Sequence, residues 1–150
     1  MENETDIAAA WFDHGFSCAQ AIVAAFGDQH GLDTQQALRV AGGFGGGMAR
    51  MGETCGAVTG ALMVIGLLYG KTRPGDDAAK EKTYQVVHQF VDEFRTRHGS
   101  ILCRDLLFCD LSTPDGSQKA RESNLFKTLC PVYVGTSAEI LKKLIEEGQA

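Results

Sequence analysis

Five cysteines are the residues of this 150-residue chain with the clearest capacity for chemistry. Cys18, Cys55 and Cys103 each follow a helix-start signal, which is expected to place them in the first turn of a helix. Free backbone N–H groups and the helix dipole stabilise a thiolate at that position, and the thiolate is the nucleophilic and metal-binding form of cysteine. Because cysteine also serves as a small buried apolar residue, packing alone is the competing interpretation.

A metal or redox site would have to be assembled from distant parts of the chain. Cys103 and Cys109 are separated by five residues and no Cys-x-x-Cys pair occurs, so the sequence contains no local metal-binding loop. Four histidines add candidate ligands. His14 is the first choice among them because it lies four residues before Cys18. Arg50 and Arg104 are candidates to stabilise thiolates, although a solvated surface charge is the simpler interpretation of each.

Glycines are also in excess, with 18 in the chain and many of them between residues 42 and 70. This segment lacks the ending of a P-loop and the third glycine of a dinucleotide fingerprint, which argues against a nucleotide cofactor. Gly52, Gly56 and Gly60 recur every four residues and are expected to form a stripe without side chains. The stripe either lets another helix pack closely or makes room for a cofactor beside Cys55, with Gly56 and Gly60 as its candidate binding residues.

Apolar residues recur at helical spacing along most of the chain, which predicts an all-α fold. Helix-start residues precede several of these segments, namely Ser17, Asp33, Asp76, Ser100 and Thr113. The expected helices cover residues 5–13, 18–26, 34–41, 55–69, 77–98 and 101–107, with a short helix from 114 and a last helix capped at Thr136. Cys130 is expected in the turn before that last helix, because proline follows it. We therefore expect a compact helical bundle with short extra helices.

Length and composition predict the domain organisation and exclude several classes of protein. The length fits a single domain over residues 1–150, and no linker or repeat divides the chain. A net charge of −5 argues against a nucleic-acid partner. The longest apolar run, residues 57–69, is too short to span a bilayer and predicts a buried helix, so the protein is not expected to be membrane-embedded. The acidic N-terminus lacks the features of an export signal, which predicts a cytoplasmic location where cysteines stay reduced.

The cysteines and glycines together carry a resemblance to a known family. The segment Cys55-Gly56-Ala57-Val58-Thr59-Gly60 has the form Cys-Gly-Ala-x-x-Gly, with Cys18 before it and Cys103 and Cys130 after it. With this pattern the chain resembles, almost end to end, the C_GCAxxG_C_C family of redox-active proteins. The segments 15–20, 43–47 and 103–107 and the pair Cys130-Pro131 add to the similarity.

This resemblance implies that Cys18, Cys55, Cys103 and Cys130 are the functional cysteines and that Cys109 is an extra one. A related domain in the split-Soret cytochrome c proteins looks like a helical unit that carries an iron–sulfur centre beside haem. The present chain has no Cys-x-x-Cys-His sequence, so no haem is expected, but four cysteines are the number that a [2Fe–2S] cluster takes. Family members also tend to be encoded near transporter genes, which implies a functional link to a transporter.

The leading hypothesis is a cytoplasmic redox protein in which these four cysteines converge from different helices. They would act as ligands of a [2Fe–2S] cluster or another thiolate-bound metal, or as thiol/disulfide pairs with Cys18 or Cys55 as the attacking thiol. The alternatives are a zinc-binding module without redox chemistry, and a helical interaction protein whose cysteines are buried structural residues. The redox partner is unknown from the sequence, which also leaves open whether the protein forms a homodimer.

Overall fold

We analysed the chain in a computed structural model that describes residues 3–149. Residues 1, 2 and 150 of the expected domain lie outside the described residues. The helices are α1 (Glu4–Asp13), α2 (Cys18–Gly27), the 3-10 turn η1 (Asp28–His30), α3 (Thr34–Val40), α4 (Gly45–Met48), α5 (Gly56–Tyr69), α6 (Asp77–His98), α7 (Cys103–Leu106), α8 (Pro114–Glu122), α9 (Leu125–Thr128) and α10 (Cys130–Gln149). Within residues 3–149 the only β-pairing is one isolated antiparallel bridge between Thr54 and Leu102. The all-α prediction is confirmed.

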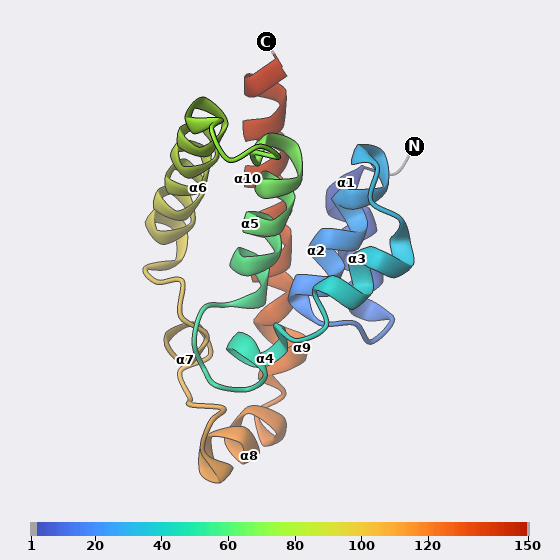
Figure 1. Cartoon of the computed structure of the whole chain (residues 1–150). Coiled ribbons are helices and arrows are strands. Elements are labelled where there is room, and N and C mark those ends of the chain that lie inside the picture. Colours follow the sequence, from blue (N-terminus) through green and yellow to red (C-terminus); the bar gives the residue numbers. More distant parts are fainter. Residues whose placement is uncertain (1–2, 150) are drawn as a thin grey trace.

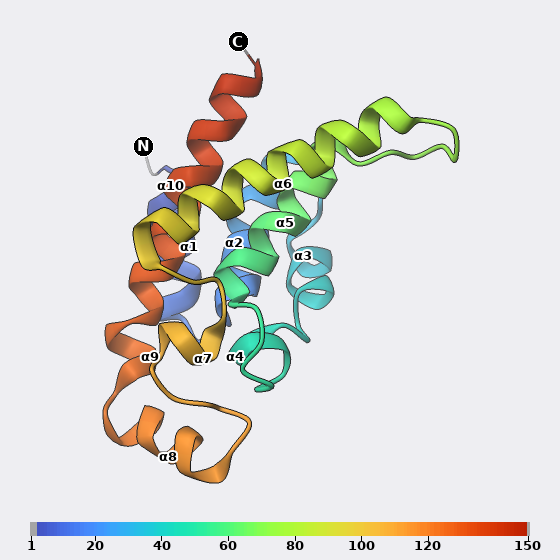
Figure 2. The same cartoon turned by 90° about the vertical axis from the view of Figure 1, so that its left-hand side faces the viewer.

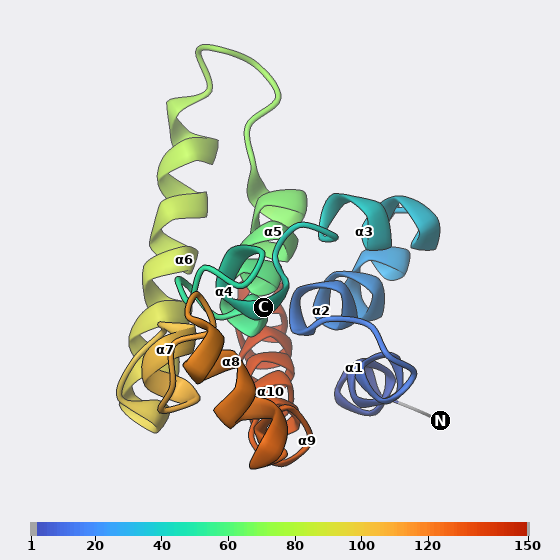
Figure 3. The same ribbon diagram turned by 90° about the horizontal axis from the view of Figure 1, so that it is seen from below.

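Helix α5 lies in the middle of the bundle, with α6 on one side of it and α2 packed against its other side (Figure 1). Helix α1 packs against α2, and α10 runs behind α5 and contacts α1, α2, α5 and α6. The connection between α5 and α6 projects away from the bundle at one end (Figure 2). The short helices α4, α7, α8 and α9 gather at the end of the bundle where α10 begins, as the view from below shows (Figure 3).

The core follows from the apolar faces of four helices. The largest fully buried side chains come from α2, α5, α6 and α10, among them Phe26, Phe90 and Phe94. Ser137 of α10 is also fully buried, and its hydroxyl donates a hydrogen bond of 2.7 Å to the carbonyl oxygen of Ala57 in the first turn of α5. This bond satisfies a polar group that would be costly to bury alone, and it ties α10 to the start of α5.

Several predicted helix starts are confirmed by their caps. Ser17 forms a complete capping box with Gln20 before α2. Asp33, Asp76 and Thr113 accept hydrogen bonds from the backbone N–H three residues later, at the starts of α3, α6 and α8. These side chains satisfy N–H groups that have no partner inside a helix, which explains why the sequence marks these starts clearly.

The structure differs from the prediction at the starts of two helices and contains a further short helix. Helix α10 begins at Cys130 rather than near Thr136, because the first turn of a helix needs no N–H donor from Pro131 and therefore tolerates it. Helix α7 begins at Cys103 rather than at Ile101, and Ser100 accepts a hydrogen bond from the N–H of Leu102 instead of capping the helix. The one-turn helix α9 was not expected at all.

The glycine-rich segment contains a left-handed turn. Five consecutive residues, 46–50, have positive φ values between 56° and 69°. Gly46 and Gly47 adopt this conformation freely, whereas Met48, Ala49 and Arg50 each carry a cost of roughly 1–2 kcal/mol. Backbone strain of this kind persists only where the surrounding structure holds it, and it clusters at functional sites. This segment borders the site described below.

The expected glycine stripe is only partly present. Gly52 precedes α5 and has a φ of 70°, so it does not continue the helical spacing of Gly56 and Gly60. A Cβ at Gly60 would lie 2.9 Å from the carbonyl oxygen of Ala19 and 3.1 Å from its Cα. Gly60 therefore allows α2 and α5 to pack closely, which is the packing interpretation of the stripe.

This close approach gives a prediction about stability. Gly60→Ala is expected to destabilise the protein by about 1–3 kcal/mol, because the added methyl group meets the backbone of α2. Gly66→Ala in the same helix is the matched control, since a Cβ there meets no atom within 4 Å and should stabilise the helix by about 0.5–1 kcal/mol. Urea unfolding of both variants measures the difference, and equal effects of the two substitutions would contradict the tight α2–α5 contact.

Candidate functional site

Each of the four cysteines in the pattern lies at the start of a helix. Cys18, Cys103 and Cys130 are the first residues of α2, α7 and α10, and Cys55 is the N-cap residue of α5. Two positions differ from the prediction, because Cys55 precedes the first turn instead of lying in it and Cys130 begins a helix instead of occupying a turn. At three of the four sites the helix has ten or more residues, so its dipole favours negative charge on sulfur.

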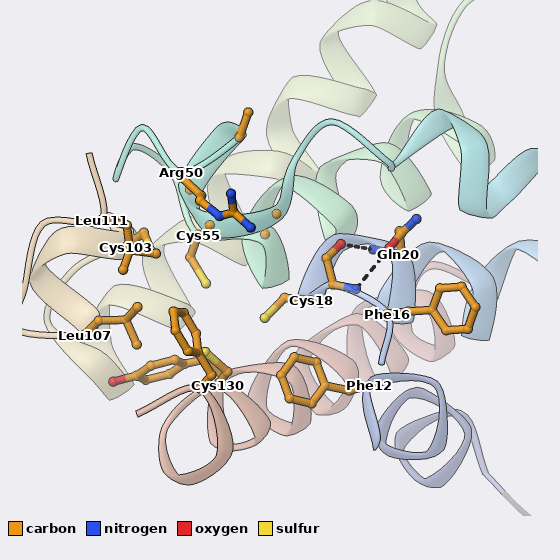
Figure 4. A pocket seen from close by; sticks show the side chains of 18 of the residues that line it. Phe12, Phe16, Cys18, Gln20, Arg50, Cys55, Cys103, Leu107, Leu111 and Cys130 are labelled. Carbon is orange, nitrogen blue, oxygen red and sulfur yellow. Dashed lines mark hydrogen bonds between the residues drawn. The ribbon is translucent and has the colours of Figure 1, made fainter. Parts of the chain in front are cut away.

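These four helix starts meet at one cavity of about 700 Å³ (Figure 4). All four cysteines line it, and Cys18 and Cys55 direct their sulfur atoms into the same space. One wall is the glycine-rich segment with α4, and another contains Phe12 and Phe16 beside α2. The interpretation of the cysteines as scattered core residues does not describe this arrangement.

Two of the thiols, those of Cys18 and Cys130, lie close enough for each to change the pKa of the other. The backbone packs tightly around two of the cysteines: a Cβ at Gly56 would lie 3.2 Å from the Cβ of Cys18, and one at Gly47 would lie 2.5 Å from the Cβ of Cys103. Glycine is therefore needed at both positions to admit the cysteines.

The environment separates the acidities of the four thiols. The interaction with Cys130, together with burial, raises the pKa of Cys18 well above its usual range. The same interaction lowers the pKa of Cys130, in opposition to burial. Burial raises the pKa of Cys55 to about 11, although backbone N–H groups at the start of α5 act against it. Burial raises the pKa of Cys103 to about 12, with contributions from Cys55 and Cys130. Of the four thiols in the cavity, Cys130 alone has a lowered pKa, so it loses its proton more readily than Cys18.

This assignment predicts how alkylation of Cys130 depends on pH. Because its pKa is lowered, Cys130 should react with iodoacetamide at pH values where an ordinary cysteine is protonated, and the reaction should be lost only as the pH falls through that lower pKa. Cys18→Ala removes the neighbouring thiol and should raise the pKa of Cys130, and each unit of increase lowers its thiolate fraction at neutral pH about ten-fold. Cys18→Ser keeps a hydroxyl that can donate a hydrogen bond and should preserve part of the effect. Mass spectrometry of the Cys130 peptide measures the rates, and identical pH profiles in all three proteins would show that Cys18 does not control Cys130.

The fifth cysteine, Cys109, lies beside the cavity without lining it. It packs against the apolar cluster that contains Cys103 and Cys130, and burial raises its pKa. Among the described residues, no histidine lines the cavity. The ring of His14 contacts the carbonyl oxygen of Ala10 at 2.7 Å, and the ring of His98 contacts the hydroxyl of Thr136 at 2.9 Å.

The arginines and glycines singled out in the sequence have different positions. Arg50 lines the cavity, whereas Arg104 lies outside it and pairs with Glu53 at 3.3 Å. Gly56 lines the cavity beside Cys18, whereas Gly60 lies in the α2–α5 contact and is not among the lining residues.

The described residues do not form a ready metal-binding geometry. In residues 3–149, no three cysteine, histidine, aspartate or glutamate side chains come together closely enough to hold a metal ion. Four cysteines match a [2Fe–2S] cluster or a zinc ion in number and kind, so the donor set fits such a group while the present spacing of the sulfur atoms does not.

A family model matches residues 16–144, a span that contains all four cysteine positions and nearly the whole cavity. The chain belongs to the C_GCAxxG_C_C family. The family is described as "Putative redox-active protein (C_GCAxxG_C_C)". No curated protein and no solved structure matches the chain. The family's name contains the order Gly-Cys-Ala, whereas this chain has Cys55-Gly56-Ala57.

Sequence reasoning missed several residues of the site in this family member. Tyr133 lines the cavity and donates a hydrogen bond of 2.6 Å to the carbonyl oxygen of Leu106, and burial raises the pKa of its hydroxyl. Arg121 of α8 and Phe126 of α9 also line the cavity. The position of Tyr133 one helical turn after Cys130 would have indicated its place, had the start of α10 been recognised. No sequence signal connects Arg121 or Phe126 to the cysteines.

None of the helices within residues 3–149 combines the length and the apolar character that crossing a membrane requires. The apolar run at residues 57–69 forms most of α5, and its side chains contribute to the main core.

Proposed function

We propose that this protein is a thiol-based redox protein in which Cys18 and Cys130 form a dithiol/disulfide couple. The observation that carries the proposal is that these two cysteines line one cavity from two different helix starts, and that each has the largest influence on the pKa of the other. A thiolate beside a protonated thiol is the arrangement that disulfide exchange requires, because one sulfur attacks and the other resolves the mixed disulfide. Sequence reasoning had favoured Cys18 or Cys55 as the attacking thiol, whereas the lowered pKa of Cys130 favours Cys130.

In this mechanism the Cys130 thiolate attacks one sulfur of a disulfide partner, whose S–S bond breaks and whose other half leaves as a thiolate. Cys18 then loses its proton to a leaving thiolate and attacks Sγ of Cys130, which releases the second half of the partner. The partner is reduced by two electrons, and the couple is oxidised by two. Cys55 and Cys103 hold their protons in this process, because burial raises the pKa of both.

A second candidate is a thiolate-bound [2Fe–2S] centre. It is favoured by the convergence of four cysteines, each from a different helix start, on one cavity. Cys18, Cys55, Cys103 and Cys130 would hold the cluster, which would supply a one-electron redox centre. Zinc bound by the same four cysteines would instead be redox-inactive.

One preparation distinguishes these functions. The protein is purified without oxygen, its visible and EPR spectra are recorded, and its iron, zinc and free thiols are counted. A colourless, metal-free protein whose thiols oxidise and recover as a pair supports the dithiol couple. Stoichiometric iron with a cluster spectrum would replace it with the second candidate, and stoichiometric zinc without reversible oxidation would exclude both redox functions.

We also propose a cytoplasmic setting for this chemistry, because a dithiol couple needs a compartment that returns its cysteines to the reduced form. The redox partner and the link to a transporter that the family resemblance implies can be tested by trapping. Cys18→Ser should retain mixed disulfides between Cys130 and its partners in cells, because the resolving thiol is missing.

A further inference from the structure

The cavity beside the cysteines is larger than a pair of exchanging thiols needs. Its volume of about 700 Å³ lies within the range of about 300–1,000 Å³ that is typical of small-molecule sites. Phe12, Phe16 and Phe126 supply apolar surface around it, and the glycine-rich segment forms a wall without side chains. A small organic molecule therefore fits beside the sulfur atoms.

The charge of the cavity is opposite to that of the whole protein. The chain carries 19 acidic residues and a net charge of −5. Among the described residues that line the cavity, Arg50 and Arg121 alone carry a formal charge, and none is acidic. Both arginines are exposed, so they lie where the cavity opens to solvent.

Neither arginine is neutralised by a carboxylate within residues 3–149. The ion pairs of the described residues involve other cations, such as Arg97 and Arg104, and Arg121 instead donates a hydrogen bond of 2.9 Å to the hydroxyl of Ser117. Arg50 extends its guanidinium over the space that Cys18 and Cys55 face (Figure 4). Guanidinium groups bind carboxylates and other oxyanions in preference to neutral groups, because their hydrogen bonds are charge-assisted.

We propose that the substrate of this site is a small anionic disulfide, whose acidic groups bind to Arg50 and Arg121 while its S–S bond lies against Cys130. This inference rests on the proposed dithiol couple and adds the class of molecule that the couple reduces. Cys130 takes one half of the disulfide as a mixed disulfide and releases the other half as a thiolate. Cys18 then forms the intrachain disulfide and releases the second thiolate, so both halves leave reduced and carry away the protons of the two thiols.

The test measures single-turnover reduction of three disulfides of different charge by the reduced protein. The anionic probe is dithiobis(nitrobenzoate), the neutral probe is bis(hydroxyethyl) disulfide and the cationic probe is cystamine. Arg50→Gln/Arg121→Gln should lower the rate constant for the anionic probe at least about ten-fold, because a charge-assisted contact is lost. The same variant should lower the rate with the neutral probe much less than the rate with the anionic probe, and should raise the rate with cystamine relative to the neutral probe. The preference for the anionic probe should also weaken as salt is added.

Lys71→Gln/Arg73→Gln provides the matched control, since it removes two positive charges, as the double variant does, but both residues lie in the connection between α5 and α6, away from the cavity. Equal losses in the control and in the double variant would mean that net charge alone attracts the probe, and would overturn the proposed site. Equal rates of all three probes in the double variant and the wild type, with the Cys18–Cys130 disulfide formed each time, would overturn the anionic substrate and leave the dithiol couple intact. If no probe produced that disulfide, both the substrate and the couple would be wrong.

Discussion

Cys18→Ser is expected to abolish formation of the intrachain disulfide while leaving the fold intact. The serine hydroxyl is close in size to the thiol and can donate a hydrogen bond, but it cannot form an S–S bond. On oxidation with glutathione disulfide the wild type should form the Cys18–Cys130 disulfide and release two molecules of glutathione, and dithiothreitol should restore both thiols. The variant should instead stop at the mixed disulfide between Cys130 and glutathione, which mass spectrometry detects directly.

Cys109→Ser is the control for this experiment, because Cys109 lies outside the cavity lining and should not be needed for the couple. It should form the Cys18–Cys130 disulfide at the wild-type rate, and the circular dichroism spectra of both variants should match that of the wild type. If Cys18→Ser still formed an intrachain disulfide rapidly, through Cys130 with Cys55 or Cys103, the assignment of Cys18 as the resolving thiol would be wrong.

Gly47→Ala is expected to destabilise the protein by at least about 3 kcal/mol, because overpacking and a left-handed backbone each carry a cost of one to a few kcal/mol. The new Cβ would lie 2.5 Å from the Cβ of Cys103 and 2.8 Å from the backbone nitrogen of Glu53. The φ of Gly47 is 68°, so the added side chain would be strained as well as crowded. To avoid these short contacts, either Cys103 or the backbone segment before α5 must move. Both border the cavity that contains the cysteines.

Gly43→Ala is the matched substitution, since Gly43 lies in the same glycine-rich segment and also lines the cavity. A Cβ at Gly43 meets no atom within 4 Å, and its φ is not positive. Urea unfolding should therefore show a small effect at Gly43 and a large one at Gly47. Similar stabilities of the two variants would mean that the left-handed turn does not hold Cys103 in the position described.

The sequence predicts the helices of this protein well where side chains mark their starts. Ser17, Asp33, Asp76 and Thr113 all cap helices as expected, because a side-chain oxygen next to free N–H groups acts locally. The start of α10 could not be predicted in the same way. Pro131 is compatible both with a turn and with the first turn of a helix. The burial of Tyr133, Val134 and Ser137 in the core favours the helix.

The candidate site shows the same division between local and distant causes. The four cysteines could be named from their positions at helix starts and from the family resemblance. It could not be predicted which two of them most strongly change each other's pKa, because α2 and α10 meet only in the folded bundle. The left-handed turn at residues 46–50 could not be predicted from the sequence either. Residues such as Met48, Ala49 and Arg50 rarely have positive φ, so tertiary contacts must hold them in this conformation. The same is true of Arg121, which reaches the cavity from α8.

The most direct test of a four-cysteine site with one exchanging pair is a redox titration of the wild-type protein followed by peptide mapping. The protein is poised at a series of potentials in a thiol/disulfide buffer, its free thiols are alkylated, and each cysteine is assigned by mass spectrometry. A peptide pair linked through Cys18 and Cys130 is expected to appear in one cooperative step while Cys55 and Cys103 stay alkylatable. If Cys18 and Cys130 remained free at potentials where other cysteines had been oxidised, they would not be the exchanging pair.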